Sequence, residues 1–251
     1  MEIKSIFFSP TGGTQKVVDF LAQELGGAAQ TIDLSIHHVD DLIMDAETVC
    51  IVGVPSFGGR VPAIALARLR EIKANGARAI LVVCYGNRDY DDTLLELQET
   101  ALACGFKPIA ALAAVTEHSM LPAFGAGRPD AADYETLRAD AARIKHALSG
   151  DAPAAIAVKG NRPYRDYHGV PLKPIADKSC NACGLCAKSC PVGAIPISEP
   201  ADTDKDKCIT CMRCVKICPQ HARKLNSVLL FAVSQKLKKA CAERKEYELF
   251  L

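Results

Sequence analysis

The sequence predicts an α/β fold in which a parallel five-stranded sheet is followed by a small α+β domain rich in cysteine. Two observations predict the sheet. Five β-rich runs alternate with helical patterns over residues 1–150, and glycine-rich loops follow three of these runs. The second domain is predicted by the cysteines, because eight of the 12 lie between Cys180 and Cys218. We therefore divide the chain into a sheet domain (1–150), a linker (151–177), a cysteine-rich domain (178–224) and a C-terminal helix (225–251).

The strands of the sheet domain are expected in five apolar or β-rich runs. These runs are 5–8, 28–34, 48–54, 79–85 and 109–115. Apolar residues at helical spacing follow four of them, from Val17 and Leu21 in the first helix to Leu137 and Ile144 in the last. This alternation indicates right-handed crossovers, which bring the carboxyl ends of all strands to one edge. A ligand is therefore expected at that edge, where the three glycine-rich loops lie.

The loop after the first strand has the composition of a phosphate site. The hydroxyl groups of Ser9, Thr11 and Thr14 surround Gly12 and Gly13, just before a helix whose N-terminal N–H groups attract anions. Such a loop would hold a phosphate monoester without a lysine. The Walker pattern and the G-x-G-x-x-G fingerprint are both absent from the sequence, which argues against nucleotide hydrolysis and a built-in nicotinamide site. The alternative is an ordinary glycine-rich turn.

This loop, Ser9-x-Thr11-Gly12-x-Thr14, resembles the phosphate loop of flavodoxins, which bind FMN. The resemblance implies the strand order 2-1-3-4-5. It also implies that the two later loops hold the flavin ring between Phe57 and Tyr90, with backbone groups of both loops at the ring edge. The FMN-binding residues implied by the resemblance are Ser9, Thr11, Gly12, Gly13, Thr14, Ser56, Phe57, Gly58, Gly59, Gly86, Asn87, Arg88 and Tyr90. The alternative for Phe57 and Tyr90 is that each ring only packs its own loop.

The cysteine-rich domain repeats one pattern twice. Cys180-x2-Cys183-x2-Cys186-x3-Cys190-Pro191 is followed, 28 residues later, by Cys208-x2-Cys211-x2-Cys214-x3-Cys218-Pro219. In this spacing three cysteines hold one [4Fe–4S] cluster, and the cysteine before the proline ligates the other cluster. We assign one cluster to Cys180, Cys183, Cys186 and Cys218, and the second to Cys208, Cys211, Cys214 and Cys190. A zinc site would favour two separated pairs of cysteines, and a disulfide framework would need an oxidising compartment.

The linker and the tail are both expected to pack against the rest of the protein. The linker contains Tyr164, Arg165 and Tyr167, and is therefore more aromatic and cationic than a spacer requires. We expect it to pack over the sheet and to fix the clusters relative to the flavin, and the alternative is a surface loop without this role. In the tail, Val233 and Leu237 lie on one helical face, which predicts that the tail docks on one of the two domains.

Charge and hydropathy argue against several classes of function. The 30 basic and 29 acidic residues leave a formal net charge of +1, which argues against a nucleic-acid surface. No apolar run approaches the roughly 18 residues needed to span a bilayer, so no integral membrane segment is expected. The chain enters its first apolar run without a cleavable leader, and a cytoplasmic location is expected. The sequence does not determine the oligomeric state.

Together the two halves resemble flavodoxin/ferredoxin fusion proteins, in which an FMN domain is joined to a two-cluster ferredoxin module. The resemblance implies an electron-transfer oxidoreductase with a redox partner protein as electron donor or acceptor, because the clusters pass single electrons and FMN accepts one or two. The alternative is a flavin-dependent reductase that acts on a small organic substrate. In that case His118, which follows the fifth strand, is a candidate proton donor. The simpler interpretation of His118 is a loop residue without a role.

Overall fold

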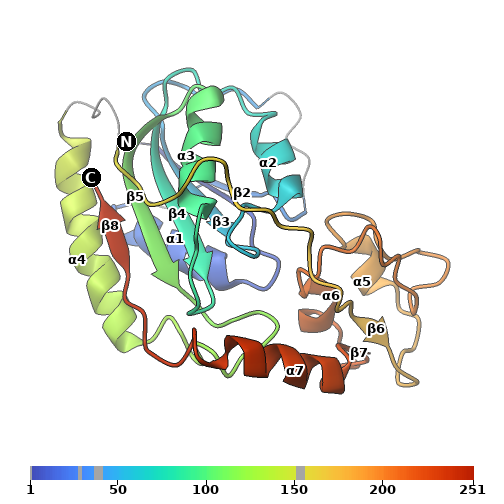
Figure 1. Ribbon diagram of the computed structural model, residues 1–251. Coiled ribbons are helices and arrows are strands. Elements are labelled where there is room, and N and C mark those ends of the chain that lie inside the picture. The colour runs from blue at the N-terminus through green and yellow to red at the C-terminus, as the bar shows by residue number, and fades with distance from the viewer. Residues whose placement is uncertain (1, 28–29, 37–41, 151–155) are drawn as a thin grey trace.

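A central sheet with helices on both faces forms the larger part of the protein (Figure 1). The structure is a computed structural model and describes residues 2–27, 30–36, 42–150 and 156–251. The strand order is β2-β1-β3-β4-β5-β8, and the first five strands are parallel. The strands are β1 (Ile3–Phe7), β2 (Gln30–Asp33), β3 (Val49–Pro55), β4 (Arg78–Tyr85), β5 (Lys107–Val115) and β8 (Glu248–Phe250). The predicted order 2-1-3-4-5 is confirmed, and β8 is an addition to it.

Four helices cover the sheet, two on each face. Helices α1 (Gly13–Glu24) and α4 (Ala131–Leu148) pack on one face, while α2 (Ala63–Leu69) and α3 (Thr93–Ala103) pack on the other. Alternate residues of each central strand contribute to the two cores, because successive side chains point to opposite faces of a sheet. Both faces are therefore apolar, which explains why the central strands are continuous hydrophobic runs in the sequence. Residues 28 and 29 of the expected second strand lie outside the described residues.

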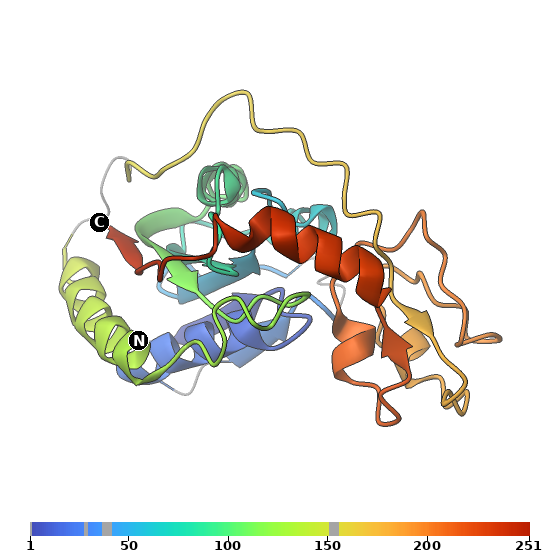
Figure 2. The same cartoon turned by 60° about the horizontal axis from the view of Figure 1, so that its bottom comes forward.

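The cysteine-rich domain is a small α+β unit at one end of the sheet domain (Figure 2). It contains two short helices and a two-stranded antiparallel sheet. These elements are β6 (Ile175–Ala176), α5 (Leu185–Lys188), α6 (Arg213–Lys216) and β7 (Arg223–Lys224). The linker reaches this domain along α3 and the loop before it, and its first five residues, 151–155, lie outside the described residues.

The tail returns to the sheet domain, but β8 and the Asn87 side chain hold it there, and no residue of its helix is buried. The helix expected over 225–251 occupies only α7 (Ser227–Lys238), whose first turn is capped by the Asn226 side chain. The chain then extends and adds β8 antiparallel to β5 (Figure 1). The sequence could not show this, because three residues are too few for a period and the pairing edge lies on a distant strand. None of the described helices is both long enough and apolar enough to cross a bilayer.

Candidate functional site

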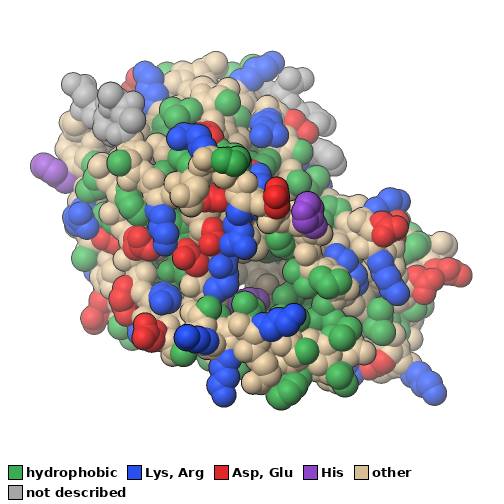
Figure 3. All heavy atoms as spheres, in the orientation of Figure 1, with side chains coloured by type: hydrophobic (Ala, Val, Ile, Leu, Met, Phe, Trp, Pro, Cys, Tyr) green, Lys and Arg blue, Asp and Glu red, His purple; other side chains and the backbone are tan. Residues whose placement is uncertain are grey.

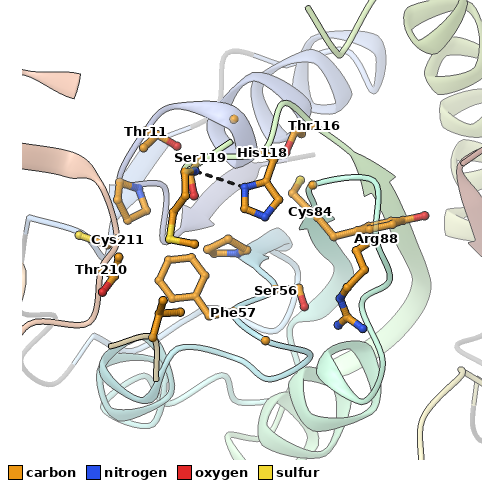
Figure 4. Close-up of a pocket in the computed structure, with 18 of the residues that line it drawn as sticks. Thr11, Ser56, Phe57, Cys84, Arg88, Thr116, His118, Ser119, Thr210 and Cys211 are labelled. Atoms are coloured by element: carbon orange, nitrogen blue, oxygen red, sulfur yellow. Dashed lines mark hydrogen bonds between the residues drawn. The ribbon is translucent and has the colours of Figure 1, made fainter. Parts of the chain in front are cut away.

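A pocket of about 310 Å³ lies at the carboxyl edge of the sheet, between the sheet domain, the linker, the cysteine-rich domain and α7 (Figure 4). Its volume is within the range of small-molecule sites. The hollow between the two lobes is visible in the space-filling view, with lysine and arginine side chains beside it (Figure 3). Nine of the thirteen residues that the sequence predicts for FMN line this pocket: Ser9, Thr11, Gly13, Thr14, Ser56, Phe57, Gly58, Gly86 and Arg88. Gly12, Gly59, Asn87 and Tyr90 are not among the lining residues.

The phosphate loop leaves the N-terminus of α1 open toward the pocket. Gly12 is the N-cap residue of the helix, with a φ of 91°, and as a glycine it has no side chain to cap the helix. The Ser9 hydroxyl accepts the N–H of Gln15 at 2.9 Å and retains its own hydrogen for a ligand. Thr11 and Thr14 also line the pocket. Ser9 accepts the N–H of Gln15 and the Gly12 carbonyl accepts that of Lys16, so the first-turn N–H groups that remain for an anion are those of Gly13 and Thr14.

The loop after β3 is a tight hairpin that presents Phe57. The backbones of Phe57 and Arg60 pair with each other at 2.9 and 3.2 Å, around Gly58 and Gly59. Both glycines have positive φ, as the central residues of such a turn require. A Cβ on Gly58 would lie 2.3 Å from the ring of Tyr167. Glycine at position 58 therefore allows the linker tyrosine to close onto this loop beside Phe57.

In the loop after β4, Asn87 and Tyr90 contact other parts of the protein and do not line the pocket. The Asn87 side chain donates to the carbonyl groups of Cys241 and Glu243, both at 2.9 Å, and accepts the N–H of Lys245 at 3.0 Å. It fixes the tail to the sheet domain. Tyr90 is only 1 % exposed, and its ring packs against Tyr85 with centroids 5.3 Å apart. Tyr90 is thus a core residue beneath the loop.

The linker supplies an aromatic residue that the prediction did not assign to the pocket. Tyr167 lines the pocket opposite the Gly58 backbone. The linker reaches this position because the Asp92 carboxylate accepts the N–H groups of Asn161 and Arg165 at 2.8 and 2.7 Å. The guanidinium of Arg60 also donates to the carbonyl of Arg165 at 2.8 Å. The aromatic and cationic composition of the linker was the only sequence signal for this contact.

His118 lies in the pocket with one ring nitrogen already occupied (Figure 4). Its Nδ1 accepts the N–H groups of Met120 and Leu121, both at 3.2 Å, so the proton of the neutral ring resides on Nε2. Burial, together with the charge of Arg88, lowers the pKa of His118. A Cβ on Gly86 would lie 2.6 Å from the imidazole, so glycine at position 86 is needed for this placement. His118 can therefore donate one hydrogen bond to a ligand at neutral pH.

Arg88 and Cys84 complete this side of the pocket. Arg88 lines it while forming an ion pair with Asp91. Cys84 at the end of β4 also lines the pocket, and burial raises the pKa of its thiol to about 12. The thiol therefore stays protonated and is not a nucleophile.

The opposite wall is formed by residues of the cysteine-rich domain and of α7. Ile209, Thr210 and Cys211 contribute from the first, and Val233, Lys236 and Leu237 from the second. Lys173 of the linker holds this wall, because its Nζ donates to the Cys208 carbonyl at 2.5 Å and to Thr210 Oγ1 at 3.3 Å. A predicted metal ligand, Cys211, thus shares the pocket with the phosphate loop.

Two smaller cavities divide the eight cysteines into the two sets that the repeat predicts. We call them the inner set (Cys190, Cys208, Cys211, Cys214) and the outer set (Cys180, Cys183, Cys186, Cys218). Residues 209–211 line both the inner cavity and the large pocket. Cys183 of the outer set is the only exposed cysteine in the described part of the chain. Within that part, no His, Cys, Asp or Glu side chains form a group of three placed for a single metal ion.

Comparison with known proteins identifies the cysteine-rich domain. Residues 179–222 match the family model described as a 4Fe-4S dicluster domain. The chain is 43% identical over 58 residues to one subunit of the ion-translocating oxidoreductase complex of Methanosarcina acetivorans, covering 23% of this chain and 22% of that protein. It is 38% identical over 64 residues to the Rpo3 component of the DNA-directed RNA polymerase of Methanosarcina mazei, covering 24% of this chain and 23% of that protein. The chain spans less than a quarter of the length of either relative.

Solved structures similar to this chain include flavodoxins and a larger oxidoreductase. The rubredoxin:oxygen oxidoreductase of Desulfovibrio gigas has a TM-score of 0.43 and 20% identity, over 59% of this chain and 36% of that one. The flavodoxin of Streptococcus pneumoniae TIGR4 has a TM-score of 0.41 and 18% identity, over 59% of this chain and 98% of that one. Similarity at this level does not extend to a shared ligand or activity. The strand order itself makes the sheet domain flavodoxin-like, and it is joined to a 4Fe–4S domain.

Proposed function

We propose that this protein is an electron-transfer flavoprotein, in which the pocket of the sheet domain binds FMN and two [4Fe–4S] clusters exchange electrons between FMN and a redox partner protein. One observation carries the proposal. Cys211, which belongs to the inner set, lines the same pocket as Thr11 of the phosphate loop and Phe57 of the second loop (Figure 4). A cluster and a flavin in these two places would be separated by a single layer of side chains.

The residues of the pocket fit FMN. Its phosphate would lie at the open N-terminus of α1, where the hydroxyl groups of Ser9, Thr11 and Thr14 add neutral donors. Its ring would lie among the side chains of Phe57 and Tyr167. When bound, FMN would supply a carrier that accepts one or two electrons.

The chain's own residues shape the surroundings of the ring site. Ile209, Val233 and Leu237 close the outer wall with apolar side chains, which keeps water from this side. His118 holds a proton on Nε2 that can be donated to a hydrogen-bond acceptor, and Arg88 provides a positive charge that favours an anionic ligand.

The positions of the two cysteine sets indicate the order in which electrons would pass through the protein. The inner set shares residues 209–211 with the pocket, whereas the outer set includes the exposed Cys183. Ligands of both sets, Cys186, Cys190 and Cys214, pack in one small apolar group. An electron would therefore pass between the partner and the outer cluster, then the inner cluster, then FMN. Two electrons released one at a time by the partner match the capacity of one FMN.

The composition of anaerobically purified protein tests the proposal. One FMN, about eight irons and about eight acid-labile sulfides per chain are expected. Two zinc ions without sulfide would contradict the clusters, and protein that retains no FMN after reconstitution would contradict the flavin site. Turnover of a small organic substrate that persists without clusters would favour the reductase alternative. Thiolate-ligated clusters also suit a reducing compartment, and we place the protein in the cytoplasm.

A further inference from the structure

Arg68 is a buried cation at the boundary between the two domains. It lies on α2, and only 4 % of its surface is exposed. One terminal nitrogen donates to the carbonyl of Leu34 in the sheet domain, and the other donates to the carbonyl of Pro191 at 2.9 Å. Its Nε is buried and has no hydrogen-bond partner among the described residues. Pro191 follows Cys190 and lines the cavity of the inner set.

Among the described residues, no carboxylate is in direct contact with Arg68. Both of its contacts are to carbonyl groups, and in the described part of the chain it forms no ion pair. Burial lowers the pKa of Arg68 even though Glu71 and Asp33 act in the opposite direction. A guanidinium in this position is costly unless a negative charge lies close to it.

A second cation, Lys173, contacts the backbone of another residue that lines the inner cavity. Lys173 is half-buried, and its ammonium donates to the carbonyl of Cys208, another member of the inner set. It also has no ion pair among the residues that the structure describes, and its other contact is the Thr210 hydroxyl. Arg68 and Lys173 therefore each donate to the backbone of a residue that lines the inner cavity.

Among the described residues, one cation lines the cavity of the outer set. Arg223 lines the outer cavity, but it is held by carbonyl groups, including that of Pro174, and by the Thr203 hydroxyl. Its contacts reach both cavities, because Pro174 and Thr203 line the inner cavity and Pro200 lines the outer one. Arg223 therefore does not distinguish the two clusters, whereas Arg68 and Lys173 do.

We propose that Arg68 and Lys173 are the counter-charges of the inner cluster, and that they raise its reduction potential above that of the outer cluster. An oxidised [4Fe–4S] unit with four thiolates carries a formal charge of about −2 and becomes more negative on reduction. A cation beside it stabilises the reduced form more than the oxidised form. Electrons that enter at Cys183 would then move toward the pocket. Only this direction rests on the proposed function, because the charge effect needs the clusters alone.

The test is a redox titration of the holoprotein followed by electron paramagnetic resonance. In Arg68→Met, one of the two cluster waves should move to a more negative potential while the other stays. Lys173→Met should move the same wave by a smaller amount, because Lys173 is more exposed and better screened. The cluster whose potential changes should be the one whose signal remains when Cys183→Ser removes the outer cluster.

Matched variants separate charge from packing. Arg70→Met removes an exposed cation from the end of the same helix and should leave both potentials unchanged. Arg68→Lys keeps the charge and should stay closer to the wild-type potential than Arg68→Met. Unchanged waves in Arg68→Met and Lys173→Met, or an equal shift of both clusters, would overturn the proposal. If Arg68→Met loses iron, the potentials of the two clusters can be compared in Arg68→Gln and Lys173→Met instead. If the potential of the inner cluster shifts in protein that binds no FMN, the charge effect is supported. The flavin assignment would then fail separately.

Discussion

In the sheet domain, two apolar cores of 27 and 20 buried residues enclose the strands, whereas the cysteine-rich domain has a core of only three, Cys186, Ala187 and Ile195. Its other buried apolar residues, Ala194, Cys211, Met212 and Ala222, lie outside that core. In small domains of this kind bound metal supplies the missing stability. We therefore expect hydrophobic packing to stabilise one half of the protein and bound clusters to stabilise the other. The pocket lies where the two halves meet.

Removal of iron should give the largest effect. Chelation under anaerobic conditions is expected to unfold the cysteine-rich domain, because its three-residue core cannot hold it. The sheet domain should keep its fold. Amide NMR spectra before and after chelation would report both domains at once, and protease sensitivity should appear only after residue 177. A metal-free cysteine-rich domain with dispersed NMR signals would break the comparison.

Tyr90→Ala should destabilise the sheet domain by about 3–5 kcal/mol, the usual cost of removing a buried aromatic side chain. The physical reason is that Tyr90 packs in the α2/α3 core and not at the pocket. Denaturant unfolding of the sheet domain checks the stability. A full loss of FMN binding with unchanged stability would show instead that Tyr90 contacts the flavin.

Asn87→Ala should release the tail at a cost of about 1–3 kcal/mol, because buried backbone groups of the tail lose their partners. Hydrogen exchange of the residues around Lys245 should increase. The amides of β4 and β5 provide the internal reference, since the sheet itself should remain protected. Unchanged exchange in the tail would mean that β8 and its pairing with β5 hold the tail without Asn87.

Phe57→Ala should have the smallest effect of the series, a loss of FMN affinity of roughly tenfold, because a stacked ring contributes about 0.5–1.5 kcal/mol beyond its buried area. Tyr167→Ala should act in the same direction. Iron content should stay at the wild-type value in both variants, which fluorescence titration of FMN and iron analysis would show together. If the FMN affinity is unchanged in both Phe57→Ala and Tyr167→Ala, the flavin ring would lie elsewhere in the pocket.

The sequence predicted what depends on local pattern. The strand order and the division of the eight cysteines into two sets both match the structure. The contacts that the sequence did not indicate depend on long-range packing. Asn87 and Tyr90 occupy the expected loop, but a returning tail and a core position determine their contacts. Tyr167 reaches the pocket only because Asp92 and Arg60 fix the linker, and no local pattern encodes those partners.

The central claim is that electrons reach the flavin through the inner cluster. This is tested by stopped-flow reduction with a low-potential donor, in which the flavin and cluster absorption bands are followed together. The experiment compares wild-type protein, Cys211→Ser and the control Cys104→Ser. Cys104 packs against the α2/α3 core and lies outside both sets. We expect Cys211→Ser to retain FMN but to lose the fast phase of flavin reduction, while Cys104→Ser keeps it. Fast flavin reduction that survives in Cys211→Ser after loss of the inner cluster would show that electrons reach the flavin by another route.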